Sequence, residues 1–394
     1  MIDILYYTLI PLPFVLLYSL NIFTTQTQPV KLKIAPESIM DKLDTEINVK
    51  VSELNLKYKK SPKIFTSLLY LSRDLLLATT TIMTTYFIQK SFNVSQYIIY
   101  PLYSVIMGTV TVGFWVLGHE CGHGAFGDNS VQNDIIGFII HSFLLVPYFS
   151  WKYSHLKHHK YTNHLILGET HVPSLHAPRN FLRKIIGEDA FTLIDIIGRL
   201  SFGWIFYLFF NETGGRTQYD CKTRIDKTKN KSHFISSSQV MKPSWKIELS
   251  TIGCLATLII ITYTNTWYWY IGPYLIVNAW LVLYTFLQHT HPDVPHYGSD
   301  KFTFLKGALC TIDRPYPYII DILHHHIGTT HVLHHINYSI PHYRAVEYTN
   351  EIKKILGEYY LYDPTPIYIA LFQAARYCVY MDSLEGIQYF KYNT

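Results

Sequence analysis

Long apolar stretches alternate with polar segments along this chain, and four of them are long enough to cross a lipid bilayer. A membrane-spanning helix needs roughly 20 mostly apolar residues to cross about 30 Å of hydrocarbon. The stretches that meet this length are 65–88, 97–118, 249–266 and 269–288. Short connections join them in pairs. The pattern therefore predicts an all-α integral membrane protein with about four core transmembrane helices in two hairpins.

Two further apolar stretches are poorer candidates for membrane crossing. The stretch 135–149 is short for a span and contains Pro147. The stretch 191–210 contains Asp195 and Arg199, which are energetically costly at the centre of a bilayer. We interpret both stretches as interfacial or re-entrant. Consequently, the segment between the hairpins and the segment after the second hairpin are expected on the same membrane face.

Charge predicts which face this is. The connections within the hairpins carry little charge, whereas lysines and arginines gather in 31–63 and 216–231. Basic segments next to spans usually remain in the cytosol. The positions 119–248 and 289–394 are therefore expected to form a cytosolic helical domain. The segment 216–231 also has the charge to dock an acidic protein.

The chain divides into three parts by hydropathy. Residues 1–23 are apolar but lack a basic start and an obvious cleavage site, so they are expected to form an anchor or interfacial helix rather than a cleaved signal. Residues 24–64 are expected to be a cytosolic N-terminal segment. Residues 65–394 contain both hairpins and form the main domain.

Composition narrows the function classes. Of 394 residues, 49% are hydrophobic and only 15% are charged, compared with about a quarter in soluble domains. The 33 tyrosines suit the aromatic belts of a membrane protein. The five cysteines are scattered and form no CxxC pair, as expected on a reducing cytosolic face. No basic and aromatic array indicates nucleic acid binding.

Histidines concentrate in three short motifs at the ends of the apolar stretches: HECGH, HLKHH and HVLHH. The histidines of these motifs are His119, His123, His155, His158, His159, His331, His334 and His335. Helix residues at i, i+3 and i+4 share a face, so each motif offers two or three ligands in one direction. Eight imidazoles exceed the four ligands of one zinc ion and predict a pair of metal ions.

Other metal proteins fit the motifs less well. HECGH matches the metalloprotease pattern HExxH, but that interpretation leaves the other two motifs without a role. Soluble di-iron proteins use two Glu-x-x-His pairs from two helices, whereas this chain has a single one, Glu120 to His123. A membrane metal-ion transporter remains an alternative of a different class. Transporters place their ligands near the bilayer midplane, however, whereas these motifs lie at the ends of the expected spans.

The motifs and their surroundings resemble the membrane fatty acyl desaturases, in particular the Δ12 (omega-6) and omega-3 acyl-lipid branch. The resemblance covers the chain from about residue 60 to the C-terminus. It is carried by the strings WVLGHECGHGAF, HSFLLVPYFSWKYSHLKHHKYTN, FLQHTHPDVPHY and THVLHHINYSIPHYRAVEYTNEIKKILGEYY.

The resemblance implies a histidine-rich di-iron site that uses O2, with the eight motif histidines as ligands. It also implies a ninth ligand after the second hairpin. His289 follows Thr285 at the spacing that related enzymes use, and His291 is its rival. Residues expected to support the ligands without binding metal are Glu120, His291, His324, His325 and His326. Asp313–Arg314 resembles a family motif, with a surface ion pair as the alternative interpretation.

The resemblance also implies partners and a location. The electron donor would be cytochrome b5 with its reductase, the substrate a membrane phospholipid or other acyl lipid, and the location the endoplasmic reticulum membrane. The remaining histidines are expected to be ordinary polar residues: His141, His164, His171, His176, His233, His296 and His342. The residues that bind the acyl chain are not identifiable from the sequence.

The expected reaction is conversion of oleoyl to linoleoyl chains by a cis double bond at Δ12. LGEYYLYDPTPIYIALFQAARYCVYM favours this branch, whereas HHHIGTTHVLHH leans toward the omega-3 branch, so an omega-3 (Δ15) desaturase is the alternative. A hydroxylase, acetylenase or conjugase on the same scaffold is a further one. Gly124 and Leu333 depart from the residues that are usual at their positions.

Overall fold

The computed structural model describes residues 29, 31–32, 43–57, 62–176 and 181–392. The predicted anchor at 1–23 and about half of the segment 24–64 lie outside these residues. Within them the chain is mainly helical, and its two strands have two residues each. The all-α prediction is therefore confirmed.

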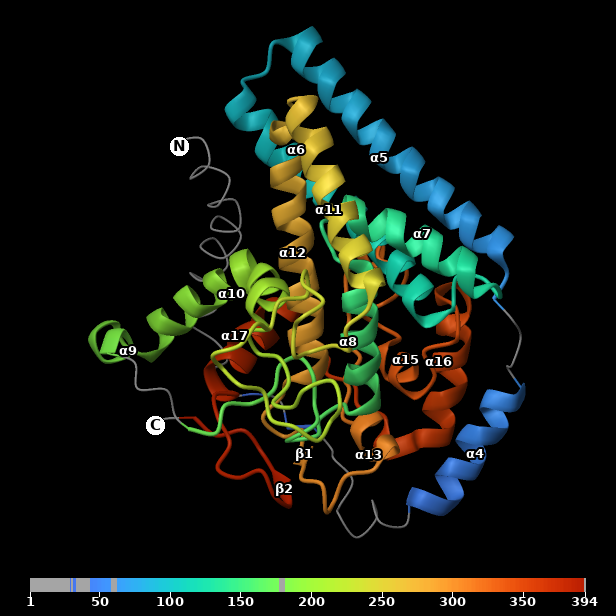
Figure 1. Cartoon of the computed structure of the whole chain (residues 1–394), viewed down its shortest axis with the longest axis vertical. Helices are drawn as coiled ribbons and strands as arrows, with labels where there is room; N and C mark the ends of the chain where they lie inside the picture. The colour runs from blue at the N-terminus through green and yellow to red at the C-terminus, as the bar shows by residue number, and fades with distance from the viewer. Residues whose placement is uncertain (1–28, 30, 33–42, 58–61, 177–180, 393–394) are drawn as a thin grey trace.

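Long helices form the upper part of the molecule in Figure 1, and they cover the four predicted spans. These helices are α5 (Ile64–Phe92), α6 (Gln96–His123), α11 (Trp245–Tyr263) and α12 (Trp267–His289). At 1.5 Å per residue the 23 residues of α12 extend for about 35 Å, enough to cross the hydrocarbon. The helices α6 and α12 pack against each other more extensively than any other pair.

Among the described residues, four helices are long and apolar enough to cross a membrane: α6, α10 (Glu188–Phe210), α11 and α12. This set contains α10 in place of the predicted α5. The 29-residue α5 is long enough, but Arg73, Asp74 and several threonines make it less apolar. In α10, Asp195 and Arg199 form an ion pair one helical turn apart. The interfacial placement of 191–210 remains a prediction, since length and composition also allow α10 to cross.

The stretch 135–149 does not form a single helix. It is divided between α7 (Ser130–Phe143) and α8 (Tyr148–Lys160), which meet at an angle of 106°. Leu145 adopts φ 55° in the connection, and Pro147 precedes the first turn of α8. Proline is well suited to a helix start because it has no backbone N–H to leave unpaired. The bend directs α8 toward the lower part of the molecule (Figure 1).

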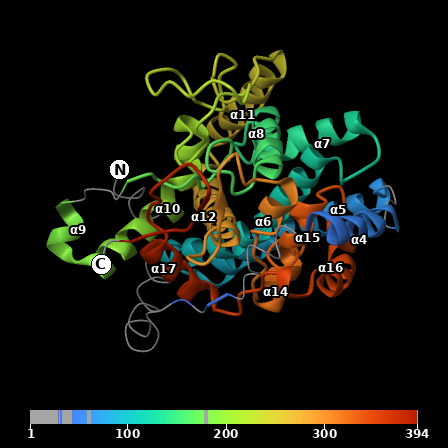
Figure 2. The ribbon, with the colours of Figure 1, turned by 90° about the horizontal axis from the view of Figure 1, so that it is seen from below.

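Short helices make up the lower part of the molecule. They are α4 (Leu43–Lys57), α9 (Phe181–Ile186), α13 (Phe304–Ala308), α14 (Tyr318–Leu323), α15 (His331–Ile336), α16 (His342–Leu356), the 3-10 helix η1 (Gly357–Tyr359) and α17 (Ile367–Tyr377). The strands β1 (His296–Tyr297) and β2 (Ile387–Gln388) pair in antiparallel fashion. Seen from below, α10 and α17 flank α12 on one side, and α15 and α16 lie on the other side of α6 (Figure 2).

The two largest apolar cores of the described residues hold these parts together. The larger lies where α6, α7, α8, α10, α12 and α17 meet. The smaller joins α4, α13, α15 and α16, and Leu333 is fully buried within it. The larger side chain that Leu333 brings to this position is thus used for packing. Truncation of a leucine in such a core typically costs about 2–5 kcal/mol.

Candidate metal centre

Four helices deliver histidines to one region in the lower half of the molecule. His119 and His123 occupy the last turn of α6, and His289 is the last residue of α12. The motif HLKHH lies within α8, and HVLHH forms most of α15. The described structure brings all nine predicted ligands together, although five of them lie far from the other four along the chain. The i, i+3, i+4 spacing places them on facing surfaces, as predicted.

Five histidines form a first group: His119, His123, His155, His159 and His334. Within it, His119 Nε2 lies 2.9 Å from His155 Nε2 and 3.2 Å from His123 Nε2. His155 Nε2 also lies 3.1 Å from His159 Nε2. The His334 ring packs against the rings of the other four.

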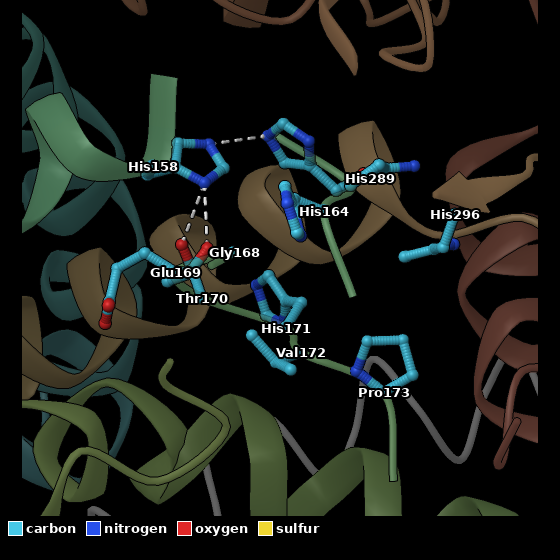
Figure 3. A pocket seen from close by; sticks show the side chains of 11 residues that line it. His158, His164, Gly168, Glu169, Thr170, His171, Val172, Pro173, His289 and His296 are labelled. Carbon is cyan, nitrogen blue, oxygen red and sulfur yellow. Dashed lines mark hydrogen bonds between the residues drawn. The ribbon is translucent and has the colours of Figure 1, made fainter. Parts of the chain in front are cut away.

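A second group adjoins the first. His158, His289 and His335 have ring nitrogens within 4.8 Å of one another. His158 Nε2 is 3.1 Å from His289 Nε2, as Figure 3 shows, and His289 Nε2 is 3.0 Å from His331 Nε2. The histidine set therefore divides into five and four, which suits two ions better than one.

The chemistry of these groups fits bound cations. A neutral imidazole has one N–H donor and one lone pair. When several Nε2 atoms lie about 3 Å from one another, hydrogen bonds among them cannot give every nitrogen a partner. Within the described residues, the buried nitrogens His334 Nε2 and His335 Nε2 have no hydrogen-bond partner. Leaving such atoms unpaired is costly, and a metal ion that accepts their lone pairs would remove the cost.

Hydrogen bonds on the far side of the rings orient two of the predicted ligands. Thr162 Oγ1 donates its one hydrogen to the carbonyl of His158. Toward His335 Nδ1, which lies 3.0 Å away, it can therefore act only as an acceptor, so Nδ1 carries the proton. His158 Nδ1 lies 3.0 Å from the carbonyl of Glu169 and therefore also carries its proton there. Both rings thus present an unprotonated Nε2 to the centre, the arrangement that metal-binding histidines commonly use.

Burial keeps the histidines of α15 in the form that binds metal. It lowers the pKa of His334 to about 3 and the pKa values of His331 and His335 well below their ordinary value. Neighbouring imidazoles lower all three further. A histidine that stays neutral keeps its lone pair available for a cation.

His289 and its rival His291 differ in their contacts. His289 lies in the second group, whereas His291 Nδ1 accepts from the backbone N–H of Asp293 at 3.1 Å. Thr285, one turn before His289, accepts from His171 Nε2 at 2.9 Å. His171 was expected to be an ordinary polar residue, but it belongs to the polar pocket beside the second group (Figure 3).

The other predicted supporting residues contact different parts of the protein. Glu120 accepts from the backbone N–H and from Nδ1 of His342, and so ties the start of α16 to α6. His324 bonds to Thr109 and Tyr284, His325 to Asp74, and His326 to Asp321. These bonds attach the HHH triplet (His324–His326) to α5, α6 and α12.

The Asp313–Arg314 pair is fully buried, so its interpretation as a surface ion pair is wrong. Arg314 pairs with Asp363 rather than with Asp313. Asp313 accepts from the backbone N–H of Val332 at 2.9 Å and from Tyr360. These bonds fix the first turn of α15, which carries His331. No sequence signal at Thr162 or Asp363 indicated their contacts.

Comparisons with known proteins agree with this arrangement. The fatty acid desaturase family model matches residues 95–365, which contain all nine histidines. The chain is 40% identical over 301 residues to the Delta(12) fatty acid desaturase FAD2 of Calendula officinalis, covering 74% of this chain and 76% of the relative. It is 38% identical over 322 residues to the Delta(12) fatty acid desaturase of Mortierella alpina (75% and 78%). It is 37% identical over 300 residues to the oleoyl-12-hydroxylase of Ricinus communis (74% and 75%).

Proposed function

Because this chain belongs to the fatty acid desaturase family, we propose that it inserts a cis double bond at Δ12 of membrane-bound oleoyl chains. The observation that carries the proposal is an apolar cavity that ends at the histidine centre. Relatives named as Δ12 desaturases favour oleoyl as the substrate.

The cavity has the character that an acyl chain requires. It lies between α6, α8, α10 and α12, and its apolar walls come from Val112, Trp115, Val116, Trp151, Trp204, Tyr207, Leu281, Tyr284 and Ile327. His119, His155, His158, His289 and His331 close its lower end. Most of these apolar side chains are buried and well packed, so the wall excludes water and leaves space for a narrow hydrocarbon chain.

We assign two iron ions to the nine histidines, five around one ion and four around the other. When bound, iron together with O2 would supply the oxidising chemistry that a mid-chain methylene needs, since the methylene has no acidic proton or leaving group. Two hydrogen atoms leave adjacent carbons, two electrons come from a donor and two protons from the medium, and O2 is reduced to two waters. The protein residues bind the chain, hold the chosen carbon–carbon bond beside the histidines and exclude bulk water.

The electron donor in this proposal is cytochrome b5 with its reductase, and the location is the endoplasmic reticulum membrane. Support for an acidic partner comes from the loop between α10 and α11, where Lys222, Arg224, Lys227 and Lys229 are exposed. Arg216, in contrast, has a structural role, because it donates to the carbonyls of Leu165 and Pro173.

The alternatives differ in their support. The hydroxylase in Ricinus communis keeps that activity as a candidate on the same scaffold. An omega-3 desaturase would use the same centre and cavity on a linoleoyl chain. The metal-transporter alternative has no support from the comparisons, whose family and relatives are lipid-modifying enzymes.

The test is the fatty acid profile of a host that makes oleate but no polyunsaturates, expressing the full chain with and without fed linoleate. Linoleate without feeding supports Δ12 activity. A triene only on feeding indicates omega-3 activity, and a 12-hydroxy product indicates the hydroxylase. His158→Ala should abolish the product, and the matched control His176→Ala, at an exposed position, should not. Protein that accumulates with iron and a working donor but forms no acyl product contradicts the proposal.

A further inference from the structure

One wall of the apolar cavity carries a tyrosine, Tyr284, whose hydroxyl is bonded on the side away from the cavity. Tyr284 lines the cavity together with Val112 and Leu281. It lies five residues before His289 on α12, which is about 7.5 Å along the helix axis. A chain that enters the cavity past the histidines therefore reaches Tyr284 with the carbons beyond the new double bond.

The hydroxyl of Tyr284 points out of the cavity to His324. Tyr284 OH lies 2.7 Å from His324 Nδ1, and His324 Nε2 lies 2.9 Å from the carbonyl of Thr109. Because a carbonyl only accepts, Nε2 must carry the histidine proton, so Nδ1 accepts from the tyrosine hydroxyl. Burial lowers the pKa of His324 to about 4, which keeps this neutral form at physiological pH.

The surroundings hold this histidine in place. His324 is fully buried, and both of its nitrogens are used. Trp280 packs edge-on against its ring and donates from Nε1 to the Thr109 hydroxyl at 3.2 Å. The contact thus links α6, α12 and the turn after α14. Nothing in the metal centre requires it, since His324 bonds to none of the nine histidines.

We infer that Tyr284, positioned by His324, is the stop that limits how far an acyl chain passes the histidine centre, and so selects chain length. The inference rests on the proposed desaturation and adds a specificity-determining residue and its positioning residue. The Tyr284 ring stands between Trp280 and Tyr316, with ring centroids 5.7 Å and 4.7 Å away. Without its hydroxyl anchor the ring loses the hydrogen bond that fixes its tilt between these two rings, and we expect the cavity to accept a longer chain.

The experiment compares Tyr284→Phe and His324→Leu with Tyr316→Phe in the full-length chain. Tyr316 is a matched control because it is buried and contacts the same ring, yet its hydroxyl has no hydrogen-bond partner among the described residues. Each variant is expressed in a host fed equal amounts of 18-carbon and 20-carbon monoenes. The ratio of 20-carbon to 18-carbon diene is measured together with protein level and iron content.

Tyr284→Phe and His324→Leu should each raise this ratio at least about threefold at unchanged iron per protein, and Tyr316→Phe should leave it unchanged. The double variant should equal the larger single effect, because both changes remove one hydrogen bond. If His324→Leu fails to accumulate, the comparison of Tyr284→Phe with Tyr316→Phe decides alone. An active wild type with an unchanged ratio in Tyr284→Phe, or an equal change in Tyr316→Phe, overturns this inference only. A wild type that forms no diene overturns the proposed function as well.

Discussion

Two histidine-rich regions lie close together in this protein, and their surroundings differ in kind. In the nine-histidine centre, ring nitrogens face other ring nitrogens about 3 Å away. In the HHH triplet, every histidine has a bond to oxygen: a carbonyl and a phenol for His324, and carboxylates for His325 and His326. The density of histidine in the sequence is similar in both. The two regions are thus distinguished by the atoms that face the imidazole nitrogens, not by the number of histidines. Nitrogens facing nitrogens suit a bound cation, whereas nitrogens bonded to oxygens connect helices.

Among the substitutions that would distinguish the two regions, loss of a histidine of the nine-histidine centre should have the largest effect on activity. His335→Ala removes a buried nitrogen from the second group, and we expect at least about a 100-fold fall in desaturation with less iron per protein. Product formation and iron content should fall together. The exposed His176→Ala should change neither. Full activity in His335→Ala would contradict the assignment of this histidine to the metal.

The next effect concerns the hydroxyl behind that ligand. Thr162→Val keeps the shape of the side chain but removes the oxygen that accepts from His335 Nδ1. Loss of such a support typically costs about 10–100-fold in metal affinity or activity. Thr162→Ser, which retains the hydroxyl, should restore most of it. Equal iron retention in both variants during dialysis against a chelator would show that the hydrogen bond does not orient the ligand.

The triplet should respond in stability rather than in iron content. His325→Ala leaves the buried carboxylate of Asp74 with Arg73 as its remaining partner, because the 2.7 Å bond from His325 is lost. Removing a hydrogen bond to a charged group should lower the free energy of unfolding by about 2–3 kcal/mol. Thermal unfolding in detergent measures the change. If folded His325→Ala instead loses iron, the triplet belongs to the metal site after all.

Acid should give the smallest effect, and it should act through the centre. The pKa values of His331 and His335 are well below 6.5 in the folded chain because of burial, so the unfolded chain binds more protons between pH 6.5 and those values. Stability therefore rises with pH in this window and falls as the pH drops below about 6.5. Protons also compete with metal for the same nitrogens. Unfolding midpoints at pH 7.5, 6.5 and 5.5 measure this loss, and a midpoint independent of pH would contradict it.

Local spacing made much of the centre predictable. HxxxH and HxxHH place their histidines on one helix face whatever the fold, and apolar length locates the helices that end beside them. His289 was predicted from its distance to Thr285 and from family resemblance, and it lies in the second group. Gly124, unusual for the family, closes α6 with φ 71°, a conformation that glycine adopts without strain.

Contacts between distant segments were not predictable. The triplet is bonded to Asp74 and Thr109, more than 200 residues away, and no periodicity in a single sequence encodes such a pairing. The bend between α7 and α8 depends on a left-handed leucine, Leu145, which sequence rules do not anticipate. The burial of Arg314, for which a surface ion pair with Asp313 was the alternative interpretation, depends on Asp363, a partner 49 residues along the chain.

The close packing of α6 on α12 couples the geometry of the histidine centre to the separation of these two helices. At Gly108 the two helices approach so closely that an added Cβ would lie 2.7 Å from Cγ2 of Ile276. His119 lies about 16 Å further along the same helix. The two helices are therefore in close contact near their middle and carry centre histidines at their C-terminal ends. A methyl group added at Gly108 would push the two helices apart and change the distances between the histidine nitrogens at their ends. The geometry of the histidine centre is therefore set partly by packing inside the membrane.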